Sequence, residues 1–192
     1  VAQLRRGTPG LLACRVADPL GERNIMTGTE IQSIWMDNAI QSYNRYAEGL
    51  DSKNWSLVRA CFADEVFIDY GAISDPTGSP DVARQADDWM KVLQGVINGF
   101  DFTRHTITNH RFEVCDELVS CTAYLTADHV IFPDPEMPVA GEQDVVTVIG
   151  EYTNSYLPGP GDLQICRSKL VVNCTRGNLA LLGEAMNRAA AQ

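Results

Sequence analysis

The alternation of hydrophobic and polar positions divides the chain into a mainly helical first half and a β-rich second half. Between Glu30 and Gly49, apolar residues recur every three or four positions, which predicts an amphipathic helix. A short helix is predicted over 54–61 and a strand over 65–70. From residue 102 onward the runs are long, rich in β-branched residues and broken by turn residues. The strands predicted there cover 102–115, 118–132, 143–157 and 163–174.

A third helix is predicted between the first strand and the β-rich half. The sequence Ser79-Pro80-Asp81 is typical of a helix start, with serine as the cap and proline in the first position. This helix is expected to run to about Gly95 or Asn98. Residues 178–192 are also compatible with a helix, which would fold over an opening of the sheet or lie against a partner subunit.

These elements predict an α+β architecture. Consecutive strands joined by short turns form an antiparallel meander, and helices segregated before such a sheet pack on one of its faces. We expect a strongly curved antiparallel sheet wrapped over the N-terminal helices, which gives a cone with an apolar cavity. Residues 1–25 are expected to be a poorly ordered N-terminal extension, residues 26–177 the cone domain, and residues 178–192 a C-terminal tail or helix.

Charge and cysteine usage limit which kinds of partner and which cellular compartment are expected. The chain has 15 basic and 25 acidic residues, a net charge of -10, and no basic cluster beyond Arg5-Arg6. Nucleic acids and anionic membranes are therefore not expected as partners. No apolar run approaches the length of a membrane span. The six cysteines form no C-x-x-C pair, so we expect buried, reduced thiols in a cytoplasmic protein.

The candidate chemistry lies at Asp51 and His105. Asp51 follows the end of the first predicted helix, and His105 lies within a predicted strand. A neutral histidine is a competent base near pH 7, and a carboxylate on its other nitrogen would fix its tautomer. Two alternative interpretations remain: Asp51 caps the second helix, and His105 is a core residue. His110 has the opposite strand parity and is expected outside, so a three-histidine metal site with His129 is not favoured.

Several motifs along the chain carry a resemblance to a known family. They are Tyr46-x-x-x-Leu50-Asp51-x-x-x-Trp55, Asp69-Tyr70-Gly71, Thr103-Arg104-His105-x-x-x-Asn109 and Asp128-His129. In this order they resemble the SnoaL-like family of the nuclear-transport-factor-2-like superfamily, over roughly residues 30–175. The members that the chain is most similar to are scytalone dehydratase, bile-acid 7α-dehydratase and dehydrochlorinase-type enzymes.

The resemblance implies roles for particular residues. Asp51 and His105 match the catalytic pair of these enzymes, Tyr46, Tyr70 and His129 match further catalytic groups, and Asp128 matches a substrate-binding carboxylate. Leu50 stands where the scytalone enzyme has a tyrosine, so no single substrate is implied. Tyr46 and Tyr70 are equally compatible with the core. Strand parity places His129 inside and Asp128 outside, unless a bulge inverts the two.

Together these features predict a cofactor-independent lyase or isomerase that acts on a hydrophobic cyclic small molecule. General acid–base chemistry by Asp51 and His105 requires no metal and no organic cofactor. The alternative is a non-catalytic binding or assembly subunit, which a large exposed apolar sheet face would favour. A homodimer or homotrimer is expected under either reading. The aromatic residues available to line the cavity, or to form general core, are Trp35, Trp55, Phe62, Trp89, Phe100 and Phe102.

Overall fold

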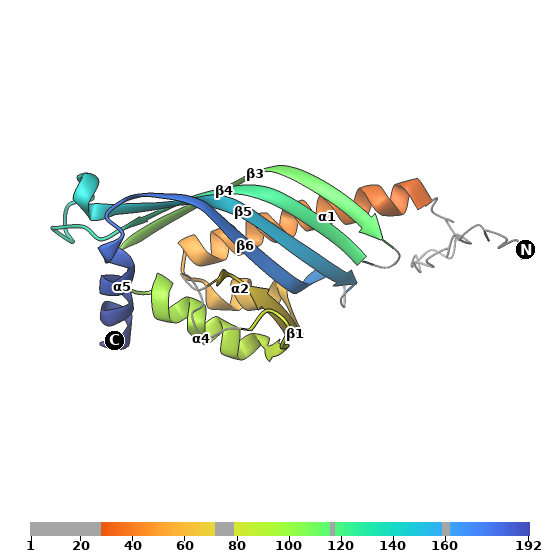
Figure 1. Cartoon of the computed structure of the whole chain (residues 1–192), viewed down its shortest axis with the longest axis horizontal. Coiled ribbons are helices and arrows are strands. Elements are labelled where there is room, and N and C mark those ends of the chain that lie inside the picture. Colours follow the sequence, from red (N-terminus) through yellow and green to blue (C-terminus); the bar gives the residue numbers. More distant parts are fainter. Residues whose placement is uncertain (1–27, 72–78, 116–117, 159–161) are drawn as a thin grey trace, which may run out of the picture.

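A curved, unclosed six-stranded sheet arches over the helices of the chain (Figure 1). The computed structural model describes residues 28–71, 79–115, 118–158 and 162–192. The extension expected over residues 1–25 and most of the loop expected over 71–80 lie outside the described residues. The helices are α1 (Gly28–Asp51), α2 (Trp55–Ala60), α4 (Ala86–Ile97) and α5 (Ala180–Ala190).

The sheet confirms the predicted antiparallel meander. Its strands are β1 (Phe62–Asp69), β2 (Arg84–Gln85), β3 (Phe102–Cys115), β4 (Leu118–Val130), β5 (Val145–Pro158) and β6 (Leu163–Gly177). The spatial order is β2-β1-β6-β5-β4-β3, so β3 to β6 pair with their neighbours in sequence. In addition, β1 lies parallel to β6, a pairing that no local pattern in the sequence indicated.

The predicted start of the third helix is wrong by six residues. The helix α4 begins at Ala86, because Arg84 and Gln85 form the short strand β2 and pair with Val66 and Glu65 of β1. The Gln85 backbone is extended, at φ -67° and ψ 135°. Pairing with β1 therefore keeps Arg84 and Gln85 extended, although the sequence Ser79-Pro80-Asp81 predicted that they belong to the helix. The helix ends at Ile97, within the expected range.

The apolar stripe of α1 explains why the sheet closes over this helix. Ala39, Tyr43, Tyr46 and Leu50 are almost fully buried and follow one another at helical spacing. They pack against the inward side chains of the sheet in one large core cluster. Because Asp51 follows Leu50 directly, the same packing fixes the position of the Asp51 carboxylate at the end of α1.

The helix α5 packs on the end of α4 and against β5. Leu181 and Ala185 are buried with Phe100, Ile131 and Val146 in a second core cluster. Arg188 donates two hydrogen bonds to the carboxylate of Asp101, at 3.1 and 2.6 Å. The α5 backbone comes so close to Gly99 that a Cβ built there would lie 1.8 Å from the carbonyl oxygen of Ala185.

Replacement of Gly99 by alanine is therefore expected to displace α5. The methyl group would meet backbone atoms, which cannot move aside as a side chain can, so we expect a loss of about 1–3 kcal/mol of stability. Gly183→Ala is the matched control, since a Cβ at Gly183, within α5 itself, meets no atom within 4 Å. That variant should gain about 0.5–1 kcal/mol from helix propensity. Thermal melts of both proteins test this opposition, and equal melting temperatures would contradict it.

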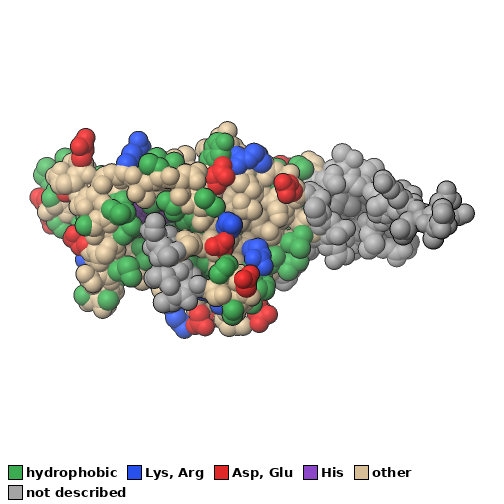
Figure 2. All heavy atoms as spheres, viewed as in Figure 1, with side chains coloured by type: hydrophobic (Ala, Val, Ile, Leu, Met, Phe, Trp, Pro, Cys, Tyr) green, Lys and Arg blue, Asp and Glu red, His purple; other side chains and the backbone are tan. Residues whose placement is uncertain are grey.

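On the face shown in Figure 2, basic and acidic side chains of the described residues are interspersed, with hydrophobic side chains between them. No helix among the described residues is long and apolar enough to cross a membrane. Cys61, Cys121, Cys166 and Cys174, the cysteines whose state the structure gives, are free thiols.

Candidate active site

Asp51 and His105 meet at the end of α1. The Oδ1 atom of Asp51 lies 2.7 Å from Nδ1 of the His105 ring. The carboxylate also accepts hydrogen bonds from the His105 backbone N–H, at 3.0 Å to Oδ2, and from the Thr103 hydroxyl, at 2.9 Å. The two side chains are only 14% and 4% exposed. Three bonds to one carboxylate from the same stretch of β3 hold the imidazole in a fixed orientation.

The electrostatics of this pair favour an ionised aspartate. Burial raises the pKa of the Asp51 carboxyl, but the hydrogen bonds from His105 and Thr103 outweigh it and bring the pKa below its ordinary value. An anionic Asp51 accepts from Nδ1–H, so Nε2 is the ring nitrogen through which His105 would act on a bound molecule. The plainer reading of Asp51 as a helix cap is wrong, because Asn54 caps α2 through a bond from the Leu57 N–H at 3.2 Å.

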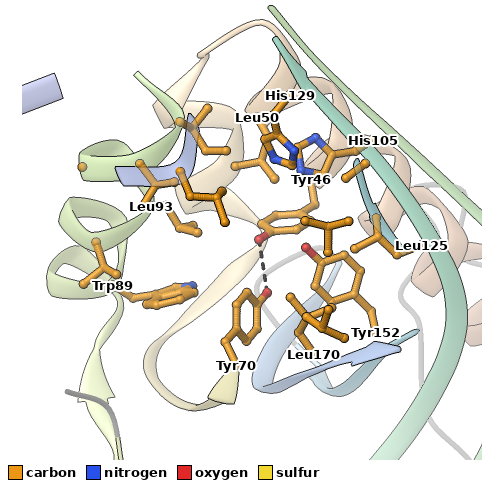
Figure 3. A pocket seen from close by; sticks show the side chains of 18 of the residues that line it. Tyr46, Leu50, Tyr70, Trp89, Leu93, His105, Leu125, His129, Tyr152 and Leu170 are labelled. Atoms are coloured by element: carbon orange, nitrogen blue, oxygen red, sulfur yellow. Dashed lines mark hydrogen bonds between the residues drawn. The ribbon is translucent and has the colours of Figure 1, made fainter. Parts of the chain in front are cut away.

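His105 forms part of the wall of an apolar cavity of about 420 Å³ (Figure 3). Such a volume suits a small organic molecule. Side chains from α1, α4, α5 and the inner face of the sheet surround it. Prominent among them are Leu50, Trp89, Leu93, Ile97, Leu125, Val148, Leu170, Leu182 and Met186. Of the aromatic residues that the sequence offered for this lining, Trp89 alone is in the wall. Lys91 also lines the cavity and pairs with Asp88 at 2.7 Å.

The other predicted lining residues lie elsewhere. Trp35 packs against the core, Phe62 is fully buried against Tyr46, and Phe100 is buried beside His129. Trp55 donates from its indole N–H to Asn98 at 3.2 Å. Phe102 is 39% exposed, because its strand parity is opposite to that of His105. The prediction that these side chains line the cavity is therefore wrong, and the core reading fits them better, except for the exposed Phe102.

The choice between Asp128 and His129 follows strand parity. Residues 118–130 alternate without a bulge, and His129 is buried at the cavity wall. Asp128 faces away and accepts a hydrogen bond from the Thr147 hydroxyl at 2.6 Å. The substrate contact suggested for Asp128 is thus wrong, since the sheet separates this carboxylate from the cavity.

The two cavity histidines lie edge to face. The ring centroids of His105 and His129 are 5.4 Å apart at an interplanar angle of 83°. Burial, and then the neighbouring His105, lower the pKa of His129 to about 4. No described residue offers a hydrogen-bond partner to Nδ1 of His129. At neutral pH this ring is therefore uncharged, and its Nδ1 atom is available for a hydrogen bond beside the His105 base.

The low pKa of His129 predicts a loss of stability on acidification from pH 6.5 toward pH 4. In this window the unfolded chain, with a histidine pKa near 6.5, binds a proton that the folded protein does not, so unfolding becomes more favourable. The full cost near pH 4 is on the order of 3 kcal/mol. Urea unfolding of the wild type and of His129→Leu at about pH 7 and about pH 5 measures it. The variant should lose less stability, and identical losses would contradict the assignment.

The predicted outward position of His110 is wrong. A bulge between Thr108 and Arg111, with Asn109 at φ 57°, places two residues of β3 opposite one residue of β4. The bulge turns His110 inward, where its ring centroid lies 5.4 Å from that of Tyr43. His110 is not part of the cavity wall. Asparagine tolerates the left-handed backbone, and this tolerance was the one sign of the bulge in the sequence.

Tyrosine hydroxyls form a second polar group in the cavity. The hydroxyls of Tyr46 and Tyr70 lie 3.2 Å apart, and that of Tyr70 lies 3.1 Å from Oγ of Ser168. Tyr152 of β5 lines the same wall. Tyr46 and Tyr70 were predicted from the sequence, whereas Tyr152, Ser168 and Asn154 were not. Strand parity could have identified the β5 residues. It places one set of alternating residues on the same face, Gly150, Tyr152, Asn154 and Tyr156, and leaves Glu151, Thr153 and Ser155 on the other.

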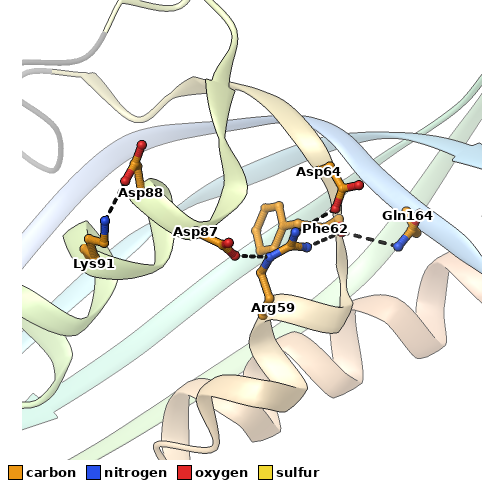
Figure 4. Close-up of polar contacts among 7 residues, drawn as sticks. All are labelled: Arg59, Phe62, Asp64, Asp87, Asp88, Lys91 and Gln164. Carbon is orange, nitrogen blue, oxygen red and sulfur yellow. Dashed lines mark hydrogen bonds and ion pairs between the residues drawn. The ribbon is translucent and has the colours of Figure 1, made fainter.

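Arg59 of α2 connects α4, which forms part of the cavity wall, to β1. The Arg59 guanidinium donates to Asp87 of α4 at 2.6 Å and to Asp64 of β1 at 2.8 Å (Figure 4). It also donates to the Phe62 carbonyl oxygen at 3.0 Å. These bonds join three elements beside the cavity and help to hold Trp89 in place.

Comparison with known proteins agrees with the observed fold. The sequence model of the SnoaL-like domain matches residues 36–169. No curated protein matches the chain. A protein from Kribbella flavida has a similar structure, with a TM-score of 0.65, 22% identity, and coverage of 83% of this chain and 99% of that one. A candidate scytalone dehydratase from Novosphingobium aromaticivorans is also similar, with a TM-score of 0.60 and 17% identity. The match covers 78% of this chain and 95% of that one.

A hexachlorocyclohexane dehydrochlorinase is also similar, with a TM-score of 0.60, 15% identity, and coverage of 77% of this chain and 91% of that one. At these low identities, the structural similarity shows a shared fold alone. The chemistry of the present chain has to be argued from its own residues.

Proposed function

Since the chain belongs to the SnoaL-like domain family, we propose that it is a cofactor-independent lyase of the dehydratase type. Its substrate is an uncharged, hydrophobic cyclic molecule with a carbonyl group. The observation that carries this proposal is the 2.7 Å bond between Asp51 and the ring of His105, at the wall of a 420 Å³ apolar cavity. The same proton transfer without a leaving group would be an isomerisation.

The proposed reaction needs only the groups already described. Nε2 of His105 removes a proton from the carbon next to the substrate carbonyl, and Asp51 stabilises the imidazolium that forms. The electron pair of the broken C–H bond becomes a C=C bond as the C–O bond to a β-hydroxyl breaks. The departing hydroxyl takes the proton from the imidazolium and leaves as water, so His105 returns to its neutral form. A hydroxyl donor at the carbonyl oxygen would stabilise the negative charge that develops there in the transition state.

The outward face of the sheet supports an enzyme rather than an assembly subunit. Among the described residues, this face carries the hydroxyl pairs Ser120–Ser155 and Thr122–Thr153, both at 2.9 Å. The ion pair Arg111–Glu151 lies on it at 3.1 Å. An assembly role predicted a large apolar face instead, and these groups interrupt any such surface.

A synthetic β-hydroxy ketone tests the proposal directly. Loss of water from 3-hydroxy-1-tetralone gives an enone that tautomerises to 1-naphthol, which is fluorescent. We expect the protein to accelerate this reaction at neutral pH over the buffer rate, and 1-tetralone, which has no leaving hydroxyl, to inhibit it competitively. Formation of 1-naphthol at the buffer rate, despite binding of 1-tetralone in the cavity, would count against a dehydratase.

A further inference from the structure

The hydroxyls of Tyr46, Tyr70 and Tyr152 converge on one region of the cavity (Figure 3). Each tyrosine comes from a different element, α1, the end of β1 and β5. The rings of Tyr46 and Tyr70 lie 6.0 and 5.8 Å from that of Tyr152, centroid to centroid. Burial raises the pKa of all three phenols, so each carries its proton at neutral pH. Three hydroxyl protons are therefore available to this cluster.

A chain of hydrogen bonds behind the cluster fixes the direction of two of these protons. The Ser168 hydroxyl donates to the amide oxygen of Asn154 at 2.6 Å, while the Asn154 amide nitrogen faces the Tyr156 hydroxyl at 3.5 Å. A hydroxyl has one proton, so Ser168 can only accept from Tyr70. With its own proton given to Ser168, Tyr70 can only accept from Tyr46.

The third proton belongs to Tyr152, whose hydroxyl interacts with those of Tyr46 and Tyr70. Because this hydroxyl stands first in the chain, its proton can turn toward a ligand without breaking the bonds from Tyr46 to Tyr70 and from Tyr70 to Ser168. We propose that Tyr152 is the hydroxyl that donates a hydrogen bond to the carbonyl oxygen of the substrate, and that Ser168 and Asn154 are positioning residues that direct the protons of Tyr70 and Tyr46 away from it. The inference rests on the proposed function for the presence of a carbonyl group in the substrate. It specifies a neutral ketone with a single acceptor oxygen at this end of the cavity.

This assignment separates Tyr152 from the two tyrosines that the sequence indicated. Tyr46 and Tyr70 support the site by holding their hydroxyls in line, and their oxygens present lone pairs rather than protons to a ligand. A hydroxyl donor in a largely apolar part of the wall favours a ligand with an acceptor oxygen over one without, because only the first can take the Tyr152 proton.

The test compares two ligands of the same ring system, 1-tetralone and tetralin, which differ in the carbonyl group. We expect the wild type to bind 1-tetralone roughly three- to tenfold more tightly than tetralin. Tyr152→Phe should remove this preference and leave the affinity for tetralin in place. Tyr124→Phe is the matched control, because Tyr124 lies on the outward face of β4 and is 47% exposed, and this variant should retain the preference. The infrared stretch of the bound carbonyl should move toward its value in an apolar solvent in Tyr152→Phe alone.

A double variant tests the directed chain itself. Without Ser168, the Tyr70 proton has no recipient behind the cavity, so one proton becomes available again to the ligand. Adding Ser168→Ala to Tyr152→Phe should therefore restore the ketone preference, which a merely structural role of Ser168 would not do. A ketone preference that persists in Tyr152→Phe would overturn the proposal, since it would require the opposite orientation of the Asn154 amide. Absence of the preference in the wild type, or failure of the double variant to recover it, would also overturn it.

These binding measurements involve no turnover. A ketone preference that depends on Tyr152, together with no dehydration of 3-hydroxy-1-tetralone, would contradict the proposed reaction and leave the donor assignment standing. Dehydration by the wild type, together with a ketone preference that Tyr152→Phe keeps, would contradict the donor assignment and leave the proposed reaction standing.

Discussion

Replacing His105 with glutamine is expected to lower kcat for loss of water from 3-hydroxy-1-tetralone by about 10²–10⁴-fold, the range that a positioned general base contributes. Glutamine has no basic nitrogen near neutral pH, so the proton next to the carbonyl has no acceptor at that place. The affinity for 1-tetralone should change little, because the variant keeps most of the wall. Stopped-flow fluorescence of 1-naphthol gives kcat, and titration with 1-tetralone gives the binding constant.

The control for His105→Gln is His110→Gln. His110 belongs to the same strand and is also partly buried, but it packs on Tyr43 and is not part of the cavity wall. We expect its kcat to remain close to that of the wild type. Equal loss of activity in both variants, or none in His105→Gln, would remove His105 from the role of base.

Asp51→Asn is expected to have an effect of similar size, about 10²–10⁴-fold on kcat, although the side chain keeps its shape. The carboxylate receives bonds on both oxygens, from the His105 ring and from the His105 backbone N–H. An amide has one acceptor oxygen, so one of these donors loses its partner. If the amide oxygen keeps the backbone bond, its NH₂ group faces Nδ1. The proton of His105 then moves to Nε2, where the base is needed.

Asp128→Asn is the matched control for this variant, because its carboxylate lies across the sheet and accepts from Thr147. We expect its kcat to lie within about twofold of the wild type, as for a surface substitution. The ¹⁵N chemical shifts of the His105 ring report the tautomer. A wild-type pattern of ring shifts in Asp51→Asn, with unchanged kcat, would contradict the orienting role of Asp51.

The amino-acid sequence determined the local elements and most of the dyad. Helical spacing placed Ala39, Tyr43, Tyr46 and Leu50 on one buried stripe, and this set the direction in which α1 ends at Asp51. Period-two alternation placed His105 and His129 inside and left Asp128 outside. Such patterns are readable because neighbours in one helix or strand have a fixed geometry that does not depend on the rest of the fold.

Contacts between distant segments decided what the sequence misassigned. Pairing of β2 with β1 moved the start of α4 by six residues, and the bulge at Asn109 turned His110 inward. The conjunction of Tyr46, Tyr70, Tyr152, Ser168 and Asn154 needed α1, β1, β5 and β6 to meet at one place. Register, bulges and hydrogen-bond direction depend on which partner a residue meets in space, and no local periodicity contains that information. The sequence thus determined which groups are available, and the tertiary structure decided which of them share a cavity.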